Sequence, residues 1–169
     1  MSDKVEKILD VGCGCDKMPN ALGIDIDENS NADIIHDLDI FPYPVEDNSF
    51  DKIFAKHIIE HLDHPQEFIA ELYRIIKIGG EILIETPHFS NYVCYTEHQH
   101  KLFYSYFLLL NLIRPLNMKI VKYDITFYKT FRHFGIQFLA NKNPRNYERF
   151  WPYIFPAENL KLIVEKVYE

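Results

Sequence analysis

Residues 8–14 read ILDVGCG, and residues 23–27 read GIDID. A short apolar run that ends at Gly12 is typical of a buried strand followed by a tight turn. Glycine lets the backbone approach a ligand, and a carboxylate at the end of the next strand, here Asp25, can accept hydrogen bonds from two ribose hydroxyls. The two segments predict the start of an adenosine-binding unit. A dinucleotide is disfavoured, because Lys17 stands where the G-x-G-x-x-G fingerprint needs its third glycine.

Outward from these segments, the chain alternates short apolar runs with one clear helix. Runs rich in Ile and Val and bounded by polar residues are what a parallel sheet covered on both faces requires. Strands are predicted over residues 7–11, 21–26, 32–36, 50–56 and 81–86, and two alternating segments predict strands over 118–127 and 159–167. Helices are predicted over 64–77, with Asp63 as its cap and Gly79-Gly80 as its stop, and over 101–113.

Residues 57–64 read HIIEHLDH, which contains the H-x-x-E-H pattern of a zinc-peptidase class. In that pattern two His side chains on one helical face hold the metal. If the helix starts only after Asp63, His57 and His61 lie at a strand-to-helix junction and not one helical turn apart. No third ligand with a telling spacing follows along the chain. We therefore predict no metal site here.

The two opening segments are followed, over residues 36–88, by HDLDIFPYPVEDNSFDKIFAKHIIEHLDHPQEFIAELYRIIKIGGEILIETPH. Together the three resemble the class I S-adenosylmethionine-dependent methyltransferases, in particular their small general subgroup. The resemblance covers roughly residues 7–90, in the family's order. It implies a three-layer, doubly wound α/β fold with a mostly parallel seven-stranded sheet of order 3-2-1-4-5-7-6 and an antiparallel last strand. The implied cofactor is S-adenosylmethionine, and the implied activity is methyl transfer.

The resemblance also implies roles for individual residues. The glycine turn passes beneath the methionine part and the sulfonium, the acid after the second strand holds the ribose diol, and the next acidic segment contacts the adenine. The stretch HIIEHL becomes active-site wall at the carboxyl end of the fourth strand. The residues implied to bind the cofactor are Asp10, Gly12, Cys13, Gly14, Asp25, Ile26, Asp37, Leu38 and Lys56.

The chain departs from the family pattern directly after Gly14. Only residues 15–20 (CDKMPN) separate the turn from the second strand, and six residues with a proline cannot form the usual three helical turns. We therefore expect a shortened first helix and a thinned pocket face. Asp16 also stands where relatives often carry a third glycine. These departures bear on donor affinity and not on the fold.

A general base near neutral pH would best be a histidine, whose unperturbed pKa is about 6.5. His57 and His88 are the predicted catalytic residues, because they follow the fourth and fifth strands. For each of them an interior histidine bonded to the backbone is the competing interpretation. The other polar candidates in these segments are Glu60, His61, His98 and His100.

The bulk composition excludes several classes of protein. Residues 1–100 hold 20 acidic against 7 basic residues, which argues against a binder that tracks nucleic-acid duplexes through many phosphate contacts. No apolar run reaches the ~18–20 residues that span a bilayer. The three cysteines have no framework spacing, which indicates free thiols in a reducing cytoplasm.

Residues 128–157 are aromatic and basic, and they are too long for a simple connection. We interpret them as a lid or substrate-facing insertion within a single domain of residues 1–169, and as a surface that could bind a partner protein. Residues 114–149 hold 8 basic against 2 acidic residues, which permits a local site for an anion.

The sequence as a whole predicts an enzyme that transfers a methyl group to a small acceptor, with an anionic acceptor allowed by the basic segment. One alternative is a non-catalytic module that keeps the nucleoside pocket and binds a partner through residues 128–157. A less favoured alternative is an NAD-dependent oxidoreductase.

Overall fold

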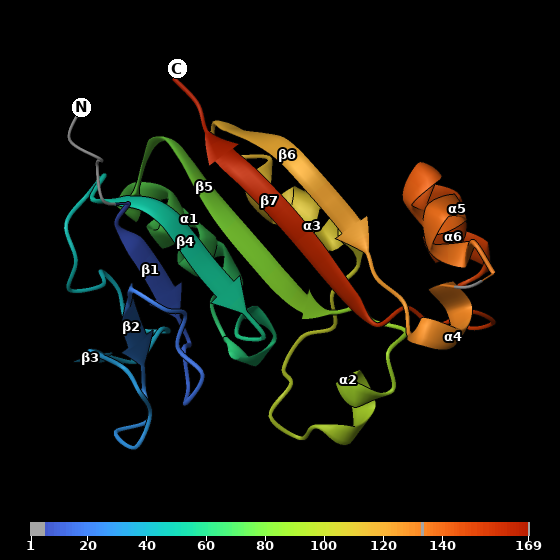
Figure 1. The fold of residues 1–169 in the computed structure, drawn as a ribbon, viewed down its shortest axis with the longest axis horizontal. Helices are drawn as coiled ribbons and strands as arrows, with labels where there is room; N and C mark the ends of the chain where they lie inside the picture. Colours follow the sequence, from blue (N-terminus) through green and yellow to red (C-terminus); the bar gives the residue numbers. More distant parts are fainter. Residues whose placement is uncertain (1–5, 133, 169) are drawn as a thin grey trace.

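A computed structural model describes residues 6–132 and 134–168. Its sheet has seven strands in the order β3-β2-β1-β4-β5-β7-β6 (Figure 1). β1 to β5 pair in parallel, and β7 runs antiparallel to β5 and β6. The implied strand order and the antiparallel last strand are confirmed. The strands are β1 Ile8–Val11, β2 Ala21–Asp25, β3 Ile34–Ile35, β4 Phe50–Lys56, β5 Ile76–Pro87, β6 Met118–Ile125 and β7 Asn159–Lys166.

The helices are short and follow β4. They comprise the 3-10 turn η1 Ile59–His61 and the α-helices α1 Pro65–Ile75, α2 Val93–Thr96, α3 Tyr106–Ile113, α4 Lys129–Arg132, α5 Ile136–Lys142 and α6 Pro144–Phe150. The last three fall within residues 128–157 and gather beyond the β6 edge of the sheet (Figure 1). None of the helices in the described part of the chain is long and apolar enough to cross a membrane.

The start of α1 differs from the predicted one. Pro65 occupies the first turn, where its missing N–H would have had no helical partner. His64 is the N-cap and its side chain makes no capping bond, so the predicted Asp63 cap is wrong. The backbone N–H groups of Asp63 and His64 instead donate to the carboxylate of Asp39, at 3.0 Å each. Asp39 therefore fixes the two residues that precede the helix, and it does not replace the missing side-chain cap.

The end of α1 is also different. The helix passes directly from Ile75 into β5, and Gly79 and Gly80 lie inside that strand. The predicted glycine stop is therefore wrong. At position 80 packing favours glycine, because a Cβ there would lie 2.8 Å from the Ile76 side chain. At position 79 the backbone conformation favours glycine, because φ is +77°.

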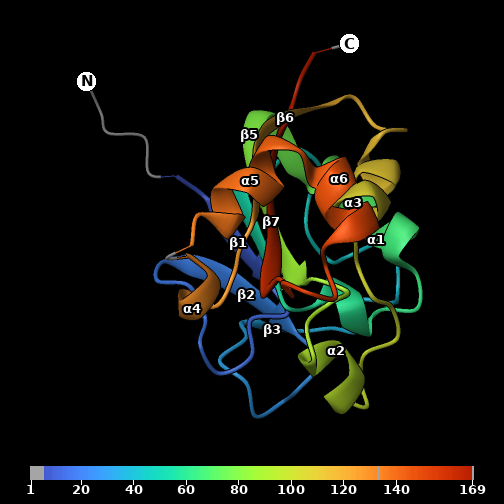
Figure 2. The same cartoon turned by 90° about the vertical axis from the view of Figure 1, so that its right-hand side faces the viewer.

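Helices α1 and α3 lie on one face of the sheet, behind it in Figure 1 and to its right in Figure 2. Residues 12–49, which hold the connections from β1 to β4, contain no helix. The shortened first helix that we expected is thus absent, since residues 12–20 form only turns and bends. Over the first four strands, the chain differs from the three-layer arrangement by lacking the helices that these connections usually supply.

The antiparallel strand β7 is buried on one side only. β7 alternates strictly between half-buried and buried residues, and the side chains on its buried side are Leu160, Leu162, Val164 and Lys166. The other side carries Lys161 and Glu165, with Lys161 paired to Glu85 of β5 at 2.9 Å. Such alternation is that of a sheet with one solvated face. The alternation predicted for residues 159–167 is therefore confirmed.

Candidate active site

Three cavities meet at the carboxyl ends of the parallel strands. We name them after one residue each: the Asp25 cavity (about 300 Å³), the Asp10 cavity (about 280 Å³) and the Glu60 cavity (about 460 Å³). Gly12 lines the first two. His61 lines the Asp25 and Glu60 cavities, and His57 lines the Asp10 and Glu60 cavities. Neighbouring cavities thus share lining residues and adjoin one another, and we call the three together the branched cleft.

Gly12 occupies the junction of this cleft for a steric reason. Its φ is +68°, and an added Cβ would lie 2.6 Å from Cγ1 of Ile58. Its N–H donates to the carbonyl of Ile24 at 2.8 Å, which holds the turn against β2. Gly14, at φ +51°, donates its N–H to the Asp25 carboxylate at 2.7 Å. The glycine turn and Asp25 are thus directly connected.

The Asp25 cavity combines two carboxylates with apolar side chains. Asp25 and Asp37 both line it, as do the buried Leu38 and Ile26, whose side chain is 63% exposed. Each carboxylate is fixed by a backbone donor two residues on, Asp27 N–H at 2.9 Å for Asp25 and Asp39 N–H at 2.9 Å for Asp37. Oxygen lone pairs remain available for ligand hydroxyl or amino groups. The structure brings together the four residues that the sequence assigned to a nucleoside.

Asp39 and Lys101 also line the Asp25 cavity, and sequence reasoning missed both. Lys101 lies 2.6 Å from the Asp63 carboxylate and 3.8 Å from that of Asp39. Burial by itself raises the pKa of Asp39, but the N–H donors of Asp63 and His64 and the charge of Lys101 outweigh burial and hold that pKa below its usual range. The ion pairs of Lys101 with Asp39 and Asp63 could be found only from the fold, because Lys101 is distant from both acids in sequence.

Asp39→Asn is expected to lower the free energy of unfolding by about 1 kcal/mol at pH 7, because the bonds lose their charged acceptor. A carboxyl with a depressed pKa stabilises the fold above its unfolded pKa of about 3.9, and this contribution is lost as pH falls through the folded pKa. Urea unfolding of both proteins should therefore show a difference at pH 7 that shrinks below about pH 4. A difference that is constant with pH would contradict the charge argument.

The Asp10 cavity carries charges of both signs. Asp10, Asp16, Lys17 and Lys56 line it together with Met18. The Asp10 carboxylate accepts the Met18 N–H at 2.7 Å, and Lys56 Nζ lies 3.4 Å from the Met18 sulfur. Burial raises the pKa of Asp10, while the Met18 N–H and Lys56 oppose that rise. A cavity with an acid and a base side by side suits a zwitterionic amino-acid group.

The loop that replaces the missing helix closes this cavity by specific bonds. Lys17 pairs with Asp33 at 2.7 Å, and the amide of Asn31 donates to the Cys15 carbonyl at 2.5 Å. The Cys13 thiol packs inward, and burial raises its pKa to about 11, so the thiol is neutral at physiological pH. The loop is therefore fixed by hydrogen bonds even though it has no helix.

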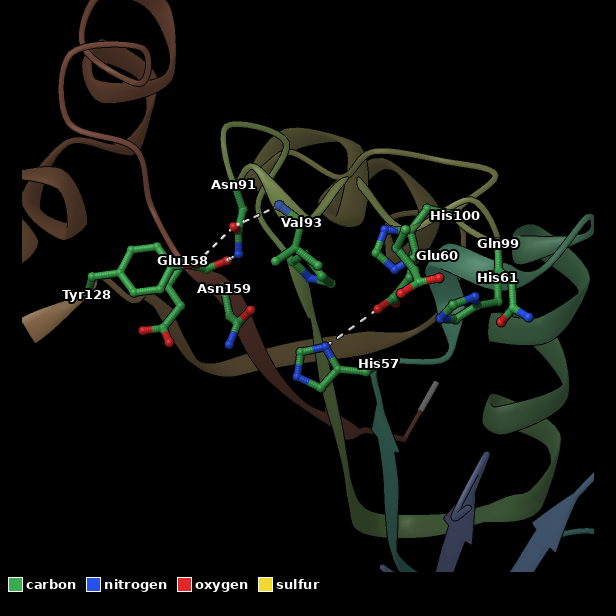
Figure 3. Close-up of a pocket in the computed structure, with 12 residues that line it drawn as sticks. His57, Glu60, His61, Asn91, Val93, Gln99, His100, Tyr128, Glu158 and Asn159 are labelled. Atoms are coloured by element: carbon green, nitrogen blue, oxygen red, sulfur yellow. Dashed lines mark hydrogen bonds and ion pairs between the residues drawn. The ribbon is translucent and has the colours of Figure 1, made fainter. Parts of the chain in front are cut away.

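The Glu60 cavity holds most of the polar residues of the HIIEHL stretch (Figure 3). His57 directly follows β4 and lies in the left-handed region, at φ +52°, an uncommon conformation for a residue with a side chain. Its Nδ1 lies 3.5 Å from Glu60 Oε1, and its Nε2 lies 3.9 Å from Glu85. The nearby Glu60 carboxylate raises the pKa of His57. His57, predicted as catalytic, thus lies between two cavities with a carboxylate behind it.

His88, the second predicted catalytic residue, lies elsewhere. It is 0% exposed, and its Nδ1 is bonded to Ser90 Oγ at 2.7 Å while its Nε2 lies 3.4 Å from Glu148. Burial lowers its pKa, and Glu148 opposes this. It does not line the Glu60 cavity, whereas its chain neighbours Pro87 and Asn91 do. The structure thus places the ring of His88 in the interior and outside the Glu60 cavity, and its catalytic role stays a prediction.

Comparison with known proteins agrees with this geometry. The methyltransferase domain family matches residues 9–84. A probable S-adenosylmethionine-dependent methyltransferase of Mycolicibacterium smegmatis is 30% identical over a segment that covers 47% of this chain and 37% of that protein. The chain thus covers well under half the length of this curated relative, and 17% of the phosphoethanolamine N-methyltransferase 2 of Caenorhabditis elegans.

Solved structures extend the likeness of the fold to the whole chain. A methyltransferase structure from Archaeoglobus fulgidus superposes with a TM-score of 0.71 at 20% identity, covering 95% of this chain and 86% of that one. The strand order therefore belongs to a known architecture. Over residues 9–84 the chain is therefore similar to S-adenosylmethionine-dependent methyltransferases, and over nearly its whole length it shares their fold.

Proposed function

We propose that the chain transfers a methyl group from S-adenosylmethionine to a small acceptor. The observation that carries the proposal is the branched cleft, in which two cavities that share Gly12 suit a nucleoside and an amino acid, and a third adjoins both. We call the Asp25 and Asp10 cavities, which would hold S-adenosylmethionine, the donor branches. His61 lies between the Asp25 cavity and the Glu60 cavity, and His57 lies between the Asp10 cavity and the Glu60 cavity. A donor lying across Gly12 would thus face the third cavity.

The residues fit the cofactor. Asp25 would accept bonds from the ribose hydroxyls and Asp37 from the adenine amino group, with Leu38 and Ile26 against the ring. Asp10 and Lys56 would hold the ammonium and carboxylate ends of the methionine part. When bound, S-adenosylmethionine supplies a methyl group on a positively charged sulfur, which leaves as a neutral thioether once the acceptor has taken the methyl. The chain's residues have to orient the acceptor and exclude water.

We place the acceptor in the Glu60 cavity. Its volume of about 460 Å³ suits a small molecule. His57 would take a proton from an acceptor that carries one, since its imidazole reaches the cavity and Glu60 stabilises the protonated ring. An anionic acceptor would be held by histidines and not by arginines, because Arg132 is engaged with Glu158, and Arg145 and Arg149 lie over the rings of Phe107 and Phe150.

Residues 128–157 extend this proposal in two ways. Tyr128 lines the Glu60 cavity and donates its hydroxyl to Asn91 at 2.9 Å, which favours the lid role. Phe134, Phe138 and Tyr153 of the same segment are exposed and could contact a partner protein. We further propose a cytoplasmic location, on the ground that Cys13, Cys15 and Cys94 are free thiols.

The proposed function predicts that purified protein, incubated with methyl-labelled S-adenosylmethionine and small-molecule extract, labels a product. Binding of S-adenosylmethionine without any labelled product would favour the non-catalytic module. Protection against heat by NAD, and none by S-adenosylmethionine, would favour the oxidoreductase and contradict the proposal. Heat denaturation with each ligand, run beside the labelling, distinguishes these results.

A further inference from the structure

A cluster of three side chains on the acceptor side of the cleft has the composition of a metal site. Glu60, His61 and His100 each offer one ligand atom, and these atoms lie within 4.8 Å of one another. The imidazoles of His61 and His100 meet edge to face, with ring centroids 4.8 Å apart. All three residues line the Glu60 cavity (Figure 3). The ligand pair of the H-x-x-E-H pattern is thus replaced by a different set, which the fold assembles from two segments.

Two atoms of this cluster point to a missing ligand. Glu60 is 2% exposed. Nδ1 of His57 lies 3.5 Å from its Oε1, at ion-pair distance, and this buried oxygen has no hydrogen-bond partner among the described residues. The buried Nδ1 of His100 has none either, within the same part of the chain. A buried polar atom left unpaired costs about 1–3 kcal/mol, so native proteins rarely leave two together. A cation between them would satisfy both.

The surroundings hold Glu60 in place. Its other carboxylate oxygen accepts the Thr86 hydroxyl at 2.9 Å, and its backbone carbonyl accepts the N–H of Lys101 at 2.8 Å. The second bond brings the loop that carries His100 beside Glu60. Partners that orient a ligand from behind in this way are typical of metal sites. Zinc bonds of about 2.0–2.1 Å in tetrahedral geometry place ligand atoms about 3.4 Å apart, so binding would draw the cluster together modestly.

We propose that Glu60, His61 and His100 bind a divalent transition-metal ion, for which zinc is the best match. Two imidazoles and one carboxylate are the ligands of zinc sites that keep a position open for water or substrate. Magnesium prefers an all-oxygen octahedral shell and does not match this set. The open position faces the Glu60 cavity. On the basis of the proposed function, the metal would bind an oxygen donor of the acceptor, a hydroxyl or carboxylate, beside the donor branch that His61 also lines.

Metal content of tag-free protein tests the site directly. After equilibrium dialysis against buffered zinc, the wild type should hold about one equivalent, removable by a chelator, and should not retain magnesium under the same conditions. His100→Ala and His61→Ala should weaken zinc binding at least about 100-fold, beyond the effect of losing an outer partner. The matched control is His98→Ala, which removes a histidine of the same loop that is 86% exposed and outside the cluster.

The proposal is overturned if the wild type holds no zinc, or if His98→Ala loses as much as His100→Ala. Circular dichroism of each variant separates ligand loss from unfolding, and His100→Ala, on a half-buried loop position, is the variant expected to fold normally. Calorimetry with S-adenosylmethionine separates this result from the proposed function. If the wild type does not bind S-adenosylmethionine but binds zinc as described, the proposed function fails and the metal site stands.

Discussion

Replacing Gly12 with alanine is expected to lower the free energy of unfolding by about 2–4 kcal/mol, the sum of overpacking and of a left-handed backbone with a Cβ. The new methyl carbon would lie 2.6 Å from Cγ1 and 2.8 Å from Cβ of Ile58. The Cβ of Ile58 is not the end of a flexible side chain, so this clash can be relieved only if the backbone moves at the start of η1. Because Gly12 lines both donor branches, binding of S-adenosylmethionine should fall as well. Urea unfolding measures the first effect and calorimetry the second.

The matched control for this variant is Gly14→Ala. Gly14 also has a positive φ, of +51°, but an added Cβ there would have no atom within 4 Å. Its cost should therefore be limited to the backbone conformation, about 1–2 kcal/mol. Equal losses of stability in the two variants would contradict the view that Gly12 is fixed by contact with Ile58.

Asp25→Ala should weaken S-adenosylmethionine binding by about 1.5–3 kcal/mol, since hydrogen bonds to a charged acceptor are lost. This corresponds to roughly 10–150-fold in the dissociation constant. The carboxylate also accepts the N–H groups of Gly14 and Asp27, so its loss loosens the glycine turn. Isothermal titration calorimetry with S-adenosylmethionine is the measurement.

Two further variants isolate the role of the Asp25 charge. Asp25→Asn keeps an oxygen acceptor for the backbone donors but removes the charge, so its affinity should lie between those of the wild type and the alanine variant. Asp27→Ala removes a nearby carboxylate that lines none of the three cavities and should leave affinity within about twofold. Unchanged affinity in Asp25→Ala would contradict the ribose assignment.

The strands were predictable because their apolar runs are bounded sharply by polar residues. β4, for example, was predicted over residues 50–56 and is observed at Phe50–Lys56. The strand order came from the family resemblance and not from the runs themselves. Asp25 could be assigned from its place at the end of the second strand, and Asp37 was implied by the same resemblance; both line one cavity.

The features that sequence reasoning missed have physical causes that a local pattern does not contain. The entry to α1 is fixed by Asp39, which lies in the chain between β3 and β4 and accepts the N–H groups of Asp63 and His64. His88 was selected by its place after a strand, but its ring turned inward. The cluster at Glu60 needs His100 from a loop about forty residues away. In each case the deciding contact joins segments that no spacing rule connects.

A crystal structure with S-adenosylhomocysteine tests the central claim most directly, namely that the Asp25 and Asp10 cavities hold one donor facing the Glu60 cavity. We predict the ribose hydroxyls at Asp25, the amino-acid end between Asp10 and Lys56, and the sulfur directed toward His57. A ligand bound outside these two cavities, or one whose sulfur faces away from His57, would contradict the account.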